Sequence, residues 1–148
     1  MHTKRAFTLI ELLVVIAIIG LLSAVVMTIL TSARTASRDT KRIADLKELK
    51  TALQLYFESN DNQYPASLSD LPPTYISIEP KDPNTGLSYF YDQVAGGTSF
   101  HLGANLEDAG HDAFRSDLDT ASDTINGADS ADCGGGTNSG RRCYDVGP

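Results

Sequence analysis

The sequence predicts an α+β protein in which one long N-terminal helix packs against a small antiparallel β-sheet. Three observations lead to this fold class. Residues 12–33 contain no charged side chain and are mostly Leu, Ile, Val and Ala. Apolar residues then recur at helical spacing as far as Phe57, and two short alternating runs flank Gly96 and Gly97. The first part of the chain is therefore expected to be helical, and the strands are expected after it.

The apolar run is long enough to cross a membrane, since a spanning helix needs about 20 apolar residues. It is also longer than the apolar part of an ordinary secretory signal, about 7 to 15 residues. We assign residues 7–32 to a transmembrane helix, with a conventional cleavage site at Thr31-Ser32-Ala33 as the alternative. Glu11 lies inside the run, where a carboxylate costs about 2.5–3.5 kcal/mol on insertion scales. It therefore needs a specific role.

Residues 33–58 continue as the amphipathic half of the same helix. Ile43, Leu46, Leu49 and Leu53 recur every three or four residues, and charged residues fill the gaps. No Pro or Gly interrupts residues 22–63, so one helix is expected over about residues 7–57. The turn-forming segment SNDNQYP, which begins at Ser59, ends it.

Residues 59–106 form a small head. A short helical turn is expected around Leu68 and Leu71, followed by a strand-like stretch at residues 75–78. Residues 87–92 and 100–104, on either side of the glycine pair, have side chains that alternate in the period-two pattern of strands. This predicts an antiparallel hairpin. Such a hairpin is too small to stand alone and would cover the apolar face of the helix. Residues 107–148 are acidic, poor in apolar residues and expected to be irregular.

Charge is distributed unevenly along the chain. Residues 31–50 carry six basic and three acidic side chains, whereas residues 51–148 carry four basic and fifteen acidic ones. An acidic surface repels phosphate backbones, so nucleic acid is not expected as a partner of the head. A further hypothesis is that the basic stem of one copy meets the acidic head of the next.

The polar side chains contain no catalytic pattern. No nucleophile stands with a matched base, and the chain is therefore not expected to be an enzyme. Cys133 and Cys143 are ten residues apart, as are His101 and His111, which does not match the short-spaced pairs of structural zinc sites. An even cysteine pair in an exported domain predicts a disulfide, with two free thiols in a cytosolic protein as the alternative.

The segment KRAFTLIELLVV, which begins at Lys4, resembles the class III signal of type IV pilins, pseudopilins and related filament subunits. The resemblance extends with decreasing strength to about Tyr91. It implies a pilin-like fold, cleavage of a cytoplasmic leader (residues 1–6) between Ala6 and Phe7, and methylation of Phe7. Ala6 stands where the family usually has Gly, and Thr28 stands where many members have Pro.

The resemblance also gives Glu11 a role. Cleavage would free an ammonium group at Phe7, and in a filament the ammonium of one subunit would pair with Glu11 of its neighbour. The implied function is a structural subunit of a type IV pilus-like or type II secretion pseudopilus filament. The implied partners are the prepilin peptidase and methyltransferase, identical or homologous pilin subunits and an inner-membrane assembly platform. The alternative is an unpolymerised, single-pass binding module with an acidic head.

The resemblance places the C-terminal domain outside the cytoplasm. The positive-inside rule alone favours the opposite orientation, because more Lys and Arg follow the apolar run than precede it. We follow the family, and the closely spaced cysteine pair also suits an oxidising compartment.

Major pseudopilins bind calcium in a loop of the acidic region. Two alternatives follow for this chain: no cofactor, or a Ca²⁺ ion held by carboxylates, for which the candidates are Asp108, Asp112, Asp117 and Asp119. The regular calcium-loop signature, with a fixed glycine and a closing Glu, is absent from the sequence.

Overall fold

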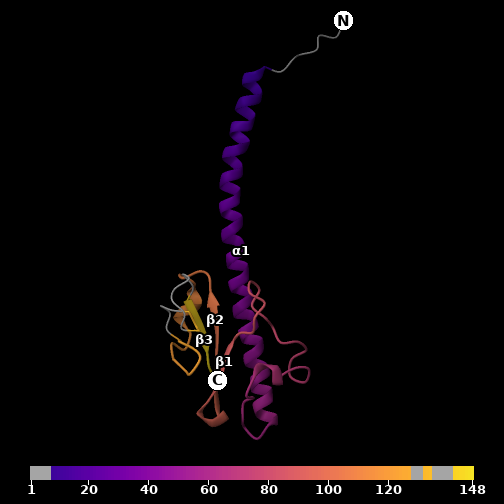
Figure 1. The fold of residues 1–148 in the computed structure, drawn as a ribbon, viewed down its shortest axis with the longest axis vertical. Coiled ribbons are helices and arrows are strands. Elements are labelled where there is room, and N and C mark those ends of the chain that lie inside the picture. The colour runs from indigo at the N-terminus through magenta and orange to yellow at the C-terminus, as the bar shows by residue number, and fades with distance from the viewer. Residues whose placement is uncertain (1–7, 128–131, 135–141) are drawn as a thin grey trace. The chain divides into compact units, whose positions relative to one another are not determined.

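The computed structural model describes residues 8–127, 132–134 and 142–148. One helix, α1 (Leu9–Ser59), precedes three strands, β1 (Phe90–Val94), β2 (Ser99–Leu106) and β3 (Arg142–Val146) (Figure 1). Three short 3-10 helices lie between them: η1 (Leu68–Asp70), η2 (Ala95–Gly97) and η3 (Asp112–Arg115). The chain divides into two compact units, Met1–Arg34 and Thr35–Pro148, so that α1 contributes to both. The α+β prediction is confirmed.

Helix α1 matches the predicted helix closely, because nothing in its sequence interrupts it. It ends where Asp61 and Asn62 adopt positive φ values of 52° and 57°. Asp and Asn tolerate this left-handed conformation better than other non-glycine residues. The expected helical turn near Leu68 is also present, as η1, and the Ser67 side chain caps it by accepting a hydrogen bond from the Ser69 amide.

The predicted hairpin is confirmed. Strands β1 and β2 pair antiparallel, with Phe90 opposite Gly103, and the turn between them uses positive φ at Gly96 (66°) and Gly97 (95°). Strand β2 also pairs antiparallel with β3, with Ala104 opposite Tyr144, which gives the sheet order β1-β2-β3 (Figure 1).

Two expectations about the head are wrong. Residues 107–148 are not irregular throughout, because β3 completes the sheet at their C-terminal end. Residues 75–78 form turns rather than a strand. In that stretch Ile76 is buried, whereas Ile78 is 80% exposed, and none of these residues belongs to the three-stranded sheet that the described residues form.

The main core lies between the second half of α1 and one face of the sheet. Leu46, Leu49 and Leu53 of α1 share a cluster of buried residues with Phe100 and Leu102 of β2. Because side chains alternate along a strand, the other face of the sheet carries a different set. That face packs a smaller cluster of Ile125, Cys133 and Cys143, with Phe90 beside it. The head is therefore layered, with the helix on one side of the sheet and Ile125 and Cys133 of the β2–β3 connection on the other.

Candidate functional site

The first half of α1 presents an exposed apolar surface. Its large apolar side chains, between Leu9 and Leu30, are 46–80% exposed. By length and composition this part of the helix is able to cross a membrane. Exposed apolar surface is unfavourable in water, so this part of the helix is suited to burial in lipid or against other chains.

Glu11 stands at the start of this apolar helix and closes a capping box with Thr8. The Thr8 amide and hydroxyl both donate to a carboxylate oxygen of Glu11, at 2.9 and 2.7 Å, and the Glu11 amide donates to the Thr8 hydroxyl at 3.3 Å. The T-x-x-E spacing is the sequence signature of this cap, so the cap could have been predicted. Glu11 thus has a local role besides the expected pairing between subunits. Ala6 and Phe7 lie outside the described residues.

A buried ion cluster ties α1 to two segments of the head. Arg42, which is 0% exposed, donates to Asp39 at 2.7 Å, to Asp82 at 2.6 Å and to Glu107 at 2.8 Å. Asp39 is also 0% exposed and accepts from the amides of Glu107 and Asp108. Arg38 adds a second guanidinium on Glu107 at 2.5 Å. One helical turn therefore holds both the turn at Asp82 and the start of the β2–β3 connection.

Two carboxyl groups of this cluster have lowered pKa values. Burial alone would raise the pKa of Asp82, but hydrogen bonds from Arg42 and from the amides of Thr85 and Asn84 outweigh it and lower the pKa to about 2. For Glu107 the hydrogen bond from Arg38 is the largest cause, and with the contribution of Arg42 it lowers the pKa to about 2 against the opposing effect of burial. Both groups are therefore charged at neutral pH.

The ion cluster also bears on the hypothesis that the basic stem of one copy meets the acidic head of the next. Arg38 and Arg42 bind acidic groups of their own head, and Lys41 pairs with Asp45 of the same helix at 3.1 Å. Much of the positive charge of the stem is thus neutralised inside one chain. These three side chains are therefore engaged within their own chain, which argues against their attracting the acidic head of an adjacent copy.

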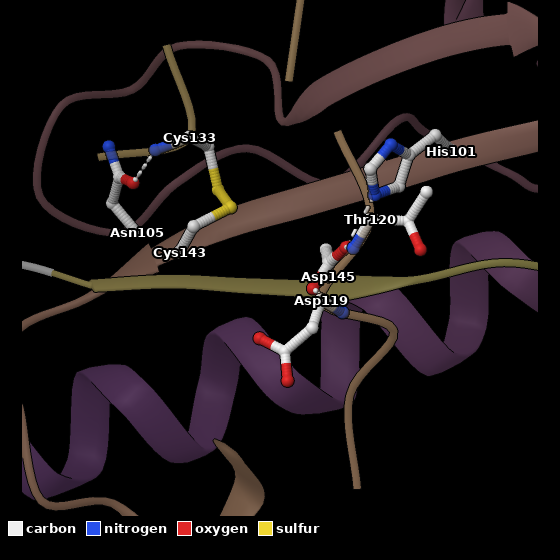
Figure 2. Close-up of a disulfide and its surroundings, with 7 residues drawn as sticks. All are labelled: His101, Asn105, Asp119, Thr120, Cys133, Cys143 and Asp145. Carbon is white, nitrogen blue, oxygen red and sulfur yellow. Dashed lines mark hydrogen bonds and ion pairs between the residues drawn. A yellow bond between two sulfur atoms is a disulfide. The ribbon is translucent and has the colours of Figure 1, made fainter. Parts of the chain in front are cut away.

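The predicted disulfide is confirmed, since Cys133 and Cys143 are bonded. Both cysteines are 0% exposed, and Figure 2 shows the bond against the sheet, with Cys143 on β3. Gly103 of β2 leaves the space for it. A Cβ atom at Gly103 would lie 3.0 Å from the Cys133 sulfur and 3.5 Å from the Cys143 sulfur.

The four candidate calcium ligands do not form a ligand set. Asp108 accepts from the Gly110 amide, and Asp112 pairs with Arg115 at 3.4 Å on the exposed surface. Asp119 is exposed, and its amide donates to Asp145, whereas Asp117 is partly buried. Among the described residues, no group of three or more His, Cys, Asp or Glu side chains could hold a metal ion. These positions do not fit a carboxylate-built calcium site there.

Known proteins are similar to this chain both in its N-terminal segment and over about two thirds of its length. A family model described as the prokaryotic N-terminal methylation motif matches residues 1–27. Over 107 residues the chain is 31% identical to the type II secretion system core protein G of Pectobacterium carotovorum subsp. carotovorum. The aligned region covers 68% of this chain and 67% of that protein. No solved structure matches the chain.

Proposed function

Because the chain belongs to the pilin and pseudopilin family, we propose that it is made as a prepilin and assembles through its N-terminal helix into a filament. Cleavage falls between Ala6 and Phe7, and Phe7 is then methylated. The similarity to a core protein of type II secretion favours a secretion pseudopilus over a type IV pilus. The role is structural, and the chain carries out no catalysis of its own.

The observation that carries this proposal is the apolar surface of α1 between Leu9 and Leu30. Burying one large aliphatic side chain stabilises a structure by about 1.5–3 kcal/mol, so burial of this whole surface is worth on the order of tens of kcal/mol. A membrane supplies that environment before assembly, and the packed helices of neighbouring subunits supply it afterwards. The same surface therefore serves first as anchor and then as filament core.

Glu11 selects the register between subunits in this proposal. A carboxylate in an apolar interior is unfavourable unless a positive group neutralises it. The ammonium group at Phe7 of an adjoining subunit provides that charge. The capping box supports the pairing, because it holds the carboxylate at the very start of the helix, close in sequence to the cleaved end.

The proposed location is the cytoplasmic membrane, with the head on the extracytoplasmic side. The disulfide supports this orientation, since such bonds persist in oxidising compartments. The partners are the prepilin peptidase and methyltransferase, identical or homologous subunits, and an inner-membrane assembly platform. After assembly the head lies at the cell surface or in the periplasm.

Two variants at Glu11 separate the charge from the cap. Glu11→Gln keeps the capping box, in which Gln is as suitable as Glu, but removes the negative charge. Glu11→Ala removes both. We expect both variants to be cleaved by the peptidase and to fail to form filaments, as judged by electron microscopy and by cross-linking of membrane fractions.

The two variants also define the result that would contradict pairing between Glu11 and the Phe7 ammonium group of a neighbour. If Glu11→Gln assembled like the natural chain while Glu11→Ala did not, the role of Glu11 would be to cap its own helix. The pairing with Phe7 of a neighbour would then be wrong, although membership of a filament would stand.

A further inference from the structure

The second face of the sheet is built to hold the long β2–β3 connection. All three strands send polar or sulfur-bearing side chains to it: Asp92 from β1, His101 and Asn105 from β2, and Cys143 and Asp145 from β3. Figure 2 shows the last four of these with the residues of the connection that they meet. Because this layer has few apolar residues, its order depends on these polar and covalent links.

Asp145 is the central carboxylate of the arrangement and is 0% exposed. It accepts hydrogen bonds from the amides of Asp119 and Thr120, at 3.2 and 3.4 Å, and it pairs with the buried imidazole of His101. Gly127 lies directly against it, since a Cβ atom there would be 2.7 Å from an Asp145 carboxylate oxygen. Both carboxylate oxygens are thus occupied by N–H groups and enclosed by backbone.

Asp92 holds a neighbouring stretch of the connection in the same way. One of its oxygens accepts from the Ser122 hydroxyl and from the Thr124 amide, the latter at 2.8 Å. The other oxygen accepts from the Thr124 hydroxyl. Burial alone would raise the pKa of Asp92, but the hydrogen bonds from Ser122 and Thr124 outweigh it and lower the pKa, so the group is charged at neutral pH.

The covalent link closes the arrangement at its far end. The Cys133 amide donates to the side-chain oxygen of Asn105 at 2.7 Å, which places Cys133 over β2 and beside Cys143. Ile125 packs on the disulfide, and the Asn126 amide donates to the Cys133 carbonyl at 2.7 Å. The disulfide thus fixes the two ends of the segment that returns the chain to β3.

A bound cation organises a loop by drawing carbonyl and carboxylate oxygens toward itself. Here the sheet offers two carboxylates, and the connection turns N–H and O–H donors toward them. We propose that Asp92, Asp145 and the Cys133–Cys143 disulfide together order residues 119–127 of the β2–β3 connection without calcium. The connection is then insensitive to metal chelation but sensitive to loss of the disulfide. This inference concerns the head of a single chain and does not depend on cleavage or filament assembly.

Hydrogen exchange of the full chain in detergent micelles, followed by mass spectrometry of peptides that cover residues 117–127, tests the proposal. We expect the same exchange rates with calcium at about 10 mM, above the weakest dissociation constants of extracellular calcium modules, and with excess chelator. We expect exchange about a hundredfold faster in the double variant Cys133→Ala and Cys143→Ala, given the entropy of closing a loop of ten residues. A chelator that accelerates exchange tenfold, or a double variant that exchanges like the natural chain, would overturn the proposal.

Two single variants test the carboxylate contribution. Asp92→Asn should accelerate exchange over residues 120–124 at least about tenfold, because a charged acceptor of three hydrogen bonds becomes a neutral one. Asp112→Asn is the matched control, since Asp112 lies on the exposed surface of the same connection and pairs with the exposed Arg115. Equal exchange in Asp92→Asn and the natural chain would contradict the role given to Asp92, whatever the state of the disulfide.

Discussion

Replacing Arg42 by Met should destabilise the head more than any other single change in the ion cluster. The Met side chain fills similar space but removes the guanidinium that binds Asp39, Asp82 and Glu107. Asp39 then stays buried, and among the described residues it keeps the amide donors of Glu107 and Asp108. Loss of one partner of a buried ion pair costs about 3–5 kcal/mol, because the remaining charge is uncompensated.

The structure favours the lower end of that range. Glu107 keeps its ion pair with Arg38, and Asp82 keeps hydrogen bonds from the amides of Asn84 and Thr85. We therefore expect a loss of about 3 kcal/mol in the free energy of unfolding. For a domain of about 100 residues this lowers Tm by roughly 15 °C. Near-UV circular dichroism is a suitable assay, since the chain has six tyrosines and no tryptophan.

Two further variants show whether the loss has this cause. Arg115→Met is the control, because Arg115 pairs with Asp112 on the exposed surface. It should change the free energy of unfolding by less than about 0.5 kcal/mol. Adding Asp39→Asn to Arg42→Met should recover part of the loss, about 1 kcal/mol, since it removes the uncompensated buried charge. The reasoning fails if Arg42→Met lowers the stability by less than about 1 kcal/mol, or if the second change makes the loss larger.

Three other predictions follow from the contacts of the head. Asp82 and Glu107 have pKa values of about 2 in the folded chain, below their ordinary values of 3.8 and 4.5, so the unfolded chain binds more protons in acid. The stability that these groups contribute is therefore complete above about pH 5 and is lost as the pH falls from about 4.5 to about 2. The free energy of unfolding, measured with urea, should fall with decreasing pH across this window. Arg42→Met should make that fall smaller. Gly103→Ala should lower the free energy of unfolding by about 1–3 kcal/mol, because its Cβ atom would press on the disulfide. The same substitution should lower it by less in a chain in which both cysteines are replaced by Ala. Equal losses in the two chains, measured by urea unfolding, would contradict this. Tyr89→Phe should cost about 1–2 kcal/mol in thermal unfolding, since the Tyr89 hydroxyl donates to the buried Asp45 carboxylate at 2.7 Å; an unchanged Tm would show that this bond adds nothing.

Local signals in the sequence were sufficient for the helix and the hairpin. The apolar run, the absence of Pro and Gly over residues 22–63, and the Asn and Asp residues after Ser59 determine where α1 lies and where it ends. Gly96 and Gly97 supply the positive φ that the β1–β2 turn needs. Each of these features depends on residues close together in the chain.

The features that could not be predicted depend on distant residues. Strand β3 has only five residues and pairs with β2 across a long acidic connection, so no local pattern marks it clearly. An amphipathic helical pattern favours solvent-facing positions for charged residues, yet Asp39, Arg42 and Asp45 of α1 are buried. Asp39 and Arg42 do continue the spacing of Leu46 and Leu49 toward the N-terminus, which is the signal that could have identified them. Their partners, Asp82 and Glu107, come from other parts of the fold.

The central claim is that this chain is a processed subunit whose new N-terminus takes part in assembly. Mass spectrometry of the N-terminal peptide, from protein purified out of membranes that contain the peptidase, tests it most directly. The account predicts a mature chain that begins at Phe7 and carries one methyl group on its amine. A chain that retains residues 1–6 would contradict it, because the ammonium group assigned to Glu11 of a neighbour would not exist.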